Sequence, residues 1–149
     1  MKLEDEIQQK EFASEHHKAL VNILFTAYHF QSIMTEKLKP YDITRQQYNV
    51  LRILRGQHPK PVSVNTVRER MLDKLSDASR IIDRLVAKKL VSRTVSTRDR
   101  RAVDINICQS GLDLLDSMAQ AILEAEAGCH QLTEKELQQL NHFLDTIRI

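Results

Sequence analysis

Apolar residues recur at three- and four-residue steps over the first part of the chain, which predicts a long amphipathic helix that ends at Pro40. A second helix is expected to begin after Thr44, a good N-cap residue, and to end at Gly56. The predicted apolar positions are Leu20, Ile23, Leu24, Ala27, Met34 and Leu38 in the first helix, and Tyr48, Leu51, Ile53 and Leu54 in the second.

Two shorter helices with a turn between them are predicted next. Ser63 is expected to cap a third helix that ends near Leu72, and Asp73-Lys74-Leu75 has turn composition. Ser76 is expected to cap a fourth helix over 77–89. This spacing is typical of a helix-turn-helix. The inward positions of the fourth helix are Ala78, Ile81, Ile82 and Leu85.

After Leu90 the apolar period changes to two, which predicts a β-hairpin with strands near 91–95 and 103–107 and a charged tip. Two further helices are predicted, one over about 110–127 and one that opens with a capping box at Thr133. The apolar positions of these helices are Leu114, Leu115, Met118, Ile122, Leu137, Leu140, Leu144 and Ile147.

The expected fold class is therefore mostly α with a small β-hairpin wing. Residues 44–107 form a winged helix-turn-helix lobe, and residues 1–38 and 110–149 form a helical dimerisation region. The apolar stripes of the terminal helices exceed what so small a lobe can cover, so packing against the same helices of a second copy is expected. A monomeric helical bundle is the alternative.

The net charge of +2 conceals an uneven distribution along the chain. Residues 60–101 carry 12 Lys and Arg against 5 Asp and Glu, whereas residues 102–149 carry 2 against 8. A basic middle indicates a face for a polyanion such as double-stranded DNA. Clustered but merely solvated surface charge is the alternative.

Several function classes find no support. No apolar run of about 18 residues occurs and the N-terminus is charged, so a cytoplasmic protein without membrane contact is expected. Cys108 and Cys129 form neither a disulfide framework nor a CxxC motif. The sequence lacks P-loop, GxGxxG, HExxH and GxSxG motifs, which argues against an enzyme and against a cofactor.

The candidate DNA-binding side chains lie in the helix-turn-helix and at the hairpin tip. Hydroxyls and guanidinium groups at the start of the fourth helix are suited to bind base edges and phosphates in the major groove. The alternative is that Arg80 forms an ion pair with Asp77 or Asp83 on a solvated face. Three arginines at the hairpin tip suit a narrow, negative minor groove. The candidates are Ser63, Lys74, Ser76, Asp77, Ser79, Arg80, Arg84, Arg98, Arg100 and Arg101.

The runs over 79–93, 99–101 and 107–111, together with 43–51, resemble the MarR family of regulators over about residues 15–147. The resemblance implies an obligate dimer, a fourth helix in the major groove and wing arginines in the minor groove. It also implies a pseudo-palindromic operator and, commonly, repression that is relieved by a small ligand or by oxidation. The alternatives are a basic protein-interaction module and a DNA-binding protein that uses no ligand.

Two positions depart from the family pattern. Lys89 stands where Gly is usual, so a left-handed backbone or a different turn is expected there. Cys108 stands where a capping Thr is usual, so Gln109 or Ser110 is expected to supply the cap.

The next question is whether the chain carries a site that senses a small ligand, oxidation or a metal ion. The resemblance implies a small aromatic effector between the dimer helices and the DNA-binding lobe, near Tyr28, His29, Tyr41 and Tyr48. Cys108 near a helix N-terminus is a candidate redox switch, and a buried structural cysteine is the alternative. His16 and His29 are thirteen residues apart on one helix, too far to share an ion, so no metal site is predicted.

Overall fold

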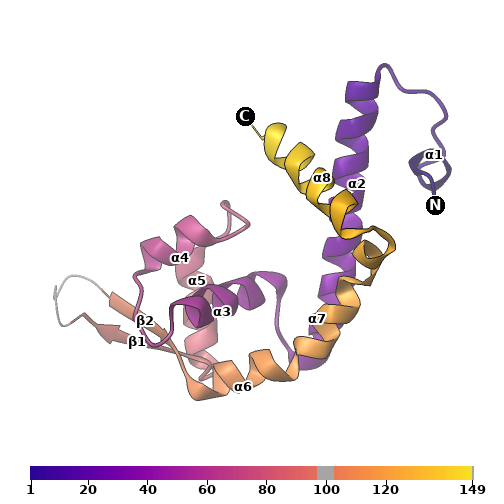
Figure 1. Ribbon diagram of the computed structural model, residues 1–149. Coiled ribbons are helices and arrows are strands. Elements are labelled where there is room, and N and C mark those ends of the chain that lie inside the picture. Colours follow the sequence, from indigo (N-terminus) through magenta and orange to yellow (C-terminus); the bar gives the residue numbers. More distant parts are fainter. Residues whose placement is uncertain (97–102, 149) are drawn as a thin grey trace.

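A computed structural model describes residues 1–96 and 103–148. Within them, helices account for most of the chain, and one two-stranded antiparallel sheet completes the fold (Figure 1). The elements in chain order are α1 (Leu3–Glu6), α2 (Glu15–Leu38), η1 (Lys39–Tyr41), α3 (Arg45–Gln57), α4 (Val64–Arg70), α5 (Ala78–Ala87), β1 (Val91–Val95), β2 (Val103–Ile107), α6 (Gln109–Ser117), α7 (Ala119–Ala125), η2 (Ala127–Gln131) and α8 (Glu134–Thr146).

The molecule consists of a lobe and a helical extension (Figure 1). The lobe contains α3, α4, α5 and the hairpin, while α2, α7 and α8 extend to one side of it. The expected fold class, a winged helix-turn-helix with additional terminal helices, is confirmed. None of the described helices is long and apolar enough to cross a membrane.

The core of the lobe is formed by the apolar faces of α3 and α5. Thr44 begins α3 with a capping box, in which its Oγ1 accepts the Gln47 N–H and the Gln47 side chain accepts the Thr44 N–H, both at 3.1 Å. Both helices bury one side and expose the other. The residues that are at most 2% exposed in these helices are Val50, Leu51, Leu54, Ile82 and Leu85.

The hairpin pairs Val91 with Ile107 and Val95 with Val103 in antiparallel register, as predicted. Val62, just before α4, bridges to Ile105 through hydrogen bonds of 3.0 and 2.8 Å between their backbone groups. This bridge ties the start of the helix-turn-helix to the wing. The tip over 97–101 lies outside the described residues.

Helices α6 and α7 connect the lobe to α2. The single helix predicted over 110–127 is wrong, because the chain bends at the fully buried Met118. The bend allows α6 to pack on the lobe and α7 to pack along α2, where Lys37 pairs with Glu124. Tertiary packing, and not a helix-breaking residue, therefore ends α6.

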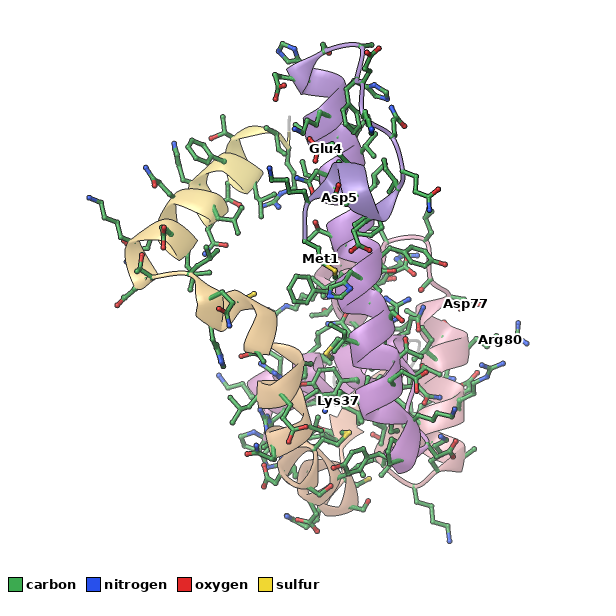
Figure 2. The ribbon with its side chains drawn as sticks, turned by 90° about the vertical axis from the view of Figure 1, so that its right-hand side faces the viewer. Met1, Glu4, Asp5, Lys37, Asp77 and Arg80 are labelled. Carbon is green, nitrogen blue, oxygen red and sulfur yellow. The ribbon has the colours of Figure 1, made fainter. Side chains whose placement is uncertain are left out.

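The last helix, α8, has no buried residue. Its capping box at Thr133 and Glu136 is present, as predicted. Within one chain the apolar stripe of α8 is uncovered, since Leu140 and Ile147 are 41% and 55% exposed, and its expected burial against a second copy stays a prediction. Physically, α8 extends away from the body of the chain and meets no core that could cover it (Figure 2).

The N-terminal segment folds back against α2 (Figure 2). Leu3 of α1 is buried, and Glu4 forms an ion pair of 2.5 Å with Lys18 of α2. This hydrogen-bonded pair lowers the pKa of Glu4 and raises the pKa of Lys18.

The junction after α5 confirms one sequence-based expectation and corrects another. Lys89 has φ of 60°, the left-handed conformation that the missing Gly predicted. Neither Gln109 nor Ser110 caps α6: Cys108 is the N-cap residue without a side-chain cap, and the Ser110 hydroxyl donates to the Lys89 carbonyl at 2.6 Å. The turn after α5 therefore binds the hydroxyl that had been expected to cap α6.

Replacing Lys89 with Gly should raise the free energy of unfolding by about 0.5–1 kcal/mol, because Gly adopts positive φ without a steric penalty. The measurement is urea unfolding at one fixed protein concentration, since association shifts apparent stability. Lys89→Ala is the matched control, because Ala removes the side chain but retains the strain. An equal gain in both variants would locate the effect in the side chain and refute the backbone explanation.

Candidate nucleic-acid interface

The start of α5 projects from the lobe. Asp77 and Arg80 lie at the outer edge of the molecule, and the Arg80 side chain points away from it (Figure 2). Because Ala78, Ile82 and Leu85 are buried, the opposite face is left to solvent. That exposed face carries Ser79, Arg80, Asp83 and Arg84.

The cap of α5 is Asp77, and the prediction that Ser76 caps this helix is wrong. The Asp77 carboxylate accepts the backbone N–H of Arg80 at 3.1 Å. The Ser76 hydroxyl instead donates to Asp73 at 2.6 Å, one residue before the cap. Asp77 therefore has a structural function at the point where α5 meets solvent.

The guanidinium groups of Arg80 and Arg84 have no acidic partner among residues 1–96 and 103–148. Asp77 binds a backbone N–H, and Asp83 forms an ion pair of 2.6 Å with Arg93 on β1. The alternative in which Asp77 or Asp83 neutralises Arg80 is therefore not realised. Two exposed cations on a helix with a buried opposite face are suited to an anionic surface.

The ion pair between Asp83 and Arg93 was not anticipated from the sequence. It joins α5 to the first strand of the wing, and both side chains are partly exposed, 60% and 40%. A solvent-exposed pair adds little stability, so its effect is on orientation. It links the direction of the hairpin to that of α5.

The turn between α4 and α5 is ordered by hydrogen bonds. Asp73 accepts the N–H of Leu75 at 3.1 Å and the hydroxyl of Ser76. The hydrogen bond from Ser76 lowers the pKa of Asp73, and the Leu75 N–H lowers it further. On the lobe side, Asn49 of α3 accepts the N–H of Leu72 at 2.9 Å. Helix α3 therefore helps to position the start of α5.

The other predicted contact residues lie around the same helices. Ser63 caps α4 by accepting the N–H of Thr66 at 3.1 Å, as predicted. Lys74 is exposed in the turn, where its ammonium group donates to the Glu69 carbonyl. Arg98, Arg100 and Arg101 lie outside the described residues, between the two wing strands.

Comparison with known proteins identifies the family. The sequence profile described as MarR family matches residues 41–102. The chain is also 31% identical to the HTH-type transcriptional repressor MdtR of Bacillus subtilis over 121 residues, which cover 76% of this chain and 74% of that protein. The chain belongs to the MarR family. It is a winged-helix transcriptional regulator.

Two solved structures show the same fold. A mutant of Escherichia coli MarR complexed with operator DNA is 21% identical, with a TM-score of 0.78 over 94% of this chain and 100% of that chain. Bordetella bronchiseptica BpsR, described as regulated in its DNA binding by 6-hydroxynicotinic acid, is 23% identical, with a TM-score of 0.68 over 88% and 99%.

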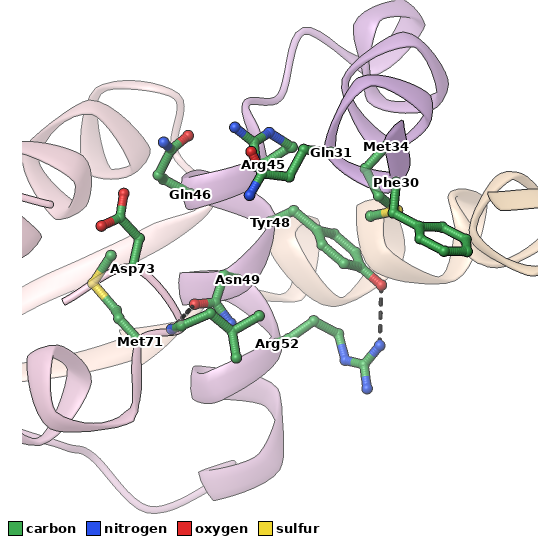
Figure 3. Close-up of a pocket in the computed structure, with 11 residues that line it drawn as sticks. Phe30, Gln31, Met34, Arg45, Gln46, Tyr48, Asn49, Arg52, Met71 and Asp73 are labelled. Carbon is green, nitrogen blue, oxygen red and sulfur yellow. Dashed lines mark hydrogen bonds between the residues drawn. The ribbon is translucent and has the colours of Figure 1, made fainter. Parts of the chain in front are cut away.

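The four aromatic residues expected near an effector do not lie together in this MarR-family chain. Tyr48 lines a cavity of about 690 Å³, and its hydroxyl accepts from Arg52 at 3.0 Å (Figure 3). Tyr28 and His29 line a separate groove of about 440 Å³ along α2. Tyr41 donates to the Ser117 carbonyl at 3.1 Å. Within one chain, only Tyr48 faces the cavity between α2 and the lobe.

Residues from α2, α3 and the α4–α5 turn enclose that cavity (Figure 3). Phe30 and Met34 come from α2, Tyr48 and Arg52 from α3, and Asp73 from the turn. The cavity therefore combines an apolar wall with cationic and acidic groups.

Among the residues that the structure describes, no group of three or more His, Cys, Asp or Glu side chains is placed to hold an ion.

Replacing Ser76 with Ala should raise the pKa of Asp73 toward its ordinary value, because the largest cause of the lowering is removed. Because the pKa of Asp73 is lowered in the folded state, its charged carboxylate contributes its full stabilisation at pH values above the ordinary Asp pKa. That stabilisation is lost as the pH falls through the lowered pKa. Carbon-detected NMR titration of the Asp73 carboxyl measures the change. Ser79→Ala, an exposed serine of α5, is the control, and an unchanged Asp73 pKa in Ser76→Ala would contradict the assignment.

Proposed function

We propose that this chain is a cytoplasmic transcriptional repressor that binds a pseudo-palindromic operator in duplex DNA as a homodimer, and that it is not an enzyme. The observation that carries the proposal is the outward face of α5, where Arg80 and Arg84 are exposed and no acidic partner lies among the residues that the structure describes. Its 31% identity to a transcriptional repressor and its fold, shared with an operator-bound protein, support this proposal.

In this proposal α5 enters the major groove. Arg80 and Arg84 bind base edges or phosphates, and Ser79 adds a short hydrogen-bonding group. Ser63 and Lys74 lie on the neighbouring turns and bind the phosphate backbone, while Ser76, whose O–H is donated to Asp73, orders the turn and Asp77 caps α5. The wing residues Arg98, Arg100 and Arg101 enter the minor groove, where A·T-rich DNA concentrates negative potential.

The terminal regions, residues 1–38 and 110–149, form the dimer interface, and residues 44–107 bind DNA. Helix α2 and helix α8 each expose large apolar side chains that a single chain leaves in water. A two-fold dimer would bury them in a self-complementary contact. The exposed apolar residues of these helices are Leu20, Leu24, Phe25, Tyr28, Leu140, Phe143 and Ile147.

A small aromatic effector would act through the cavity between α2 and the lobe. A ligand there would touch Asp73 of the α4–α5 turn and Tyr48 and Arg52 of α3. Since the Asp73 turn precedes the cap of α5, an occupant that favours one arrangement of this turn would shift α5 relative to DNA. The size of the cavity and the regulation described for BpsR support this part of the proposal. A basic protein-interaction module is not favoured, because the known relatives are transcriptional repressors.

Selection of bound duplexes from a random pool tests the function. We expect the most strongly enriched duplex to be palindromic, with half-sites about 10 bp apart, and its affinity for the protein to fall steeply as the salt concentration rises. Single strands of the same sequence should not compete. Weak binding without sequence enrichment would overturn the proposal.

On the selected operator, Arg84→Ala should reduce the preference over unrelated DNA by about 1–3 kcal/mol, because a bidentate contact to a base is lost. Fluorescence anisotropy with specific and unrelated duplexes measures the preference. Arg55→Ala removes a cation that is paired with Asp116 and should leave the preference unchanged. A uniform loss on all duplexes would make Arg84 a phosphate contact and refute base reading.

Phe143→Glu should dissociate the dimer, because it places a carboxylate in the apolar face of α8, where Phe143 is 58% exposed in one chain. Analytical ultracentrifugation measures the molecular mass. Gln138→Glu adds the same charge to a different side of α8 and should remain dimeric. A monomeric wild-type chain, or an unchanged dimer in Phe143→Glu, would contradict this interface.

A further inference from the structure

Two leucines of the α4–α5 turn are exposed although the lobe around them buries its apolar side chains. Leu72 is 87% exposed and Leu75 is 98% exposed. Leu72 lines the cavity between α2 and the lobe. Leu75 lines none of the cavities described above, so neither the core nor the cavity accounts for its apolar character.

The backbone of Leu75 is held in place. Its N–H donates to the Asp73 carboxylate, which also accepts the hydroxyl of Ser76. Two residues later Asp77 caps α5. An apolar side chain on a backbone that is already ordered loses little further entropy when it binds a partner.

Charged groups of both signs flank Leu75. Lys74 precedes it in the turn and Arg80 is exposed in the first turn of α5, whereas the carboxylates of Asp73 and Asp77 accept the backbone N–H groups of Leu75 and Arg80. The two cations are therefore the charged groups left to a partner. A protein partner that recognises apolar groups would need a larger apolar patch than Leu75 and the nearby Leu72 provide, whereas an anionic partner with an isolated apolar group matches this arrangement. Duplex DNA is such a partner, because thymine is the base that presents a methyl group in the major groove.

We propose that Leu75 is a specificity-determining residue that contacts the C5-methyl group of a thymine in each half-site. This inference rests on the proposed function, since it places the start of α5 in the major groove. Because Leu75 removes the thymine methyl group from water, the protein binds an operator with thymine at that position more tightly than one with any of the other three bases. Arg80 and Arg84 read polar base edges, so Leu75 adds an apolar element that they do not supply.

A thymine-to-uracil scan of the selected operator tests the proposal, because uracil lacks only the C5-methyl group. For the wild-type chain, uracil at one position should weaken binding by about fourfold when a single half-site is substituted, the factor that corresponds to burial of one methyl group, and by about sixteenfold when both half-sites are substituted. Leu75→Ser should bind the thymine operator more weakly and should lose the difference between thymine and uracil. Leu75→Met retains an apolar side chain and should keep that difference.

Three results would overturn the inference. The first is a wild-type chain that binds the operator specifically but responds to no uracil substitution. The second is a uracil response that persists unchanged in Leu75→Ser, which would assign the methyl contact to another side chain. Either result would leave the proposed function intact. The third, absence of any selected operator, would remove the proposed function and this inference with it.

Discussion

The contact between the apolar faces of α3 and α5 is the constraint on which the interface depends. Leu51 and Leu54 of α3 and Ile82 and Leu85 of α5 belong to one buried cluster and are at most 2% exposed. Burial of four such side chains contributes roughly 1.5–3 kcal/mol each, several times more than an exposed ion pair. Because one side of α5 is fixed in the core, the side with Arg80 and Arg84 must face solvent.

Polar contacts then set the direction of the elements around α5. Asn49 holds the preceding turn, Asp77 caps the helix, and the pair of Asp83 and Arg93 joins α5 to the wing. None of these contacts contributes much stability alone. Together they make the turn, the helix and the hairpin parts of one surface, and the bend at Met118 connects that surface to α2.

Local signals predicted much of this fold. The capping residues at Thr44, Ser63 and Thr133 and the period change after Leu90 act over a few residues, so the sequence pattern reveals them. The left-handed conformation of Lys89 followed from the family resemblance, because Gly is usual at that position. The choice between Ser76 and Asp77 as cap was missed, because both are good capping residues that differ by one position in where the helix begins.

Features that depend on distant packing could not be predicted. The bend at Met118 follows from the need of α6 and α7 to pack on different neighbours, and no residue type marks it. The pair of Asp83 and Arg93 spans a helix and a strand. Tyr28, His29, Tyr41 and Tyr48 were grouped because the family resemblance implies an effector near them, yet they lie on different surfaces of one chain. For the candidate site, sequence therefore indicates which face of α5 is exposed but not what orients it.

If a dimer of terminal helices holds two α5 helices at a fixed separation along duplex DNA, binding depends on the spacing of the half-sites. This dependence is measured by comparing the selected operator with a duplex in which five base pairs, about half a helical turn, are inserted between the half-sites. We predict that affinity for the extended duplex falls to that for unrelated DNA, because the half-sites then face opposite sides of the helix. Equal affinity for the two duplexes would show that the two α5 helices are not held at a fixed separation.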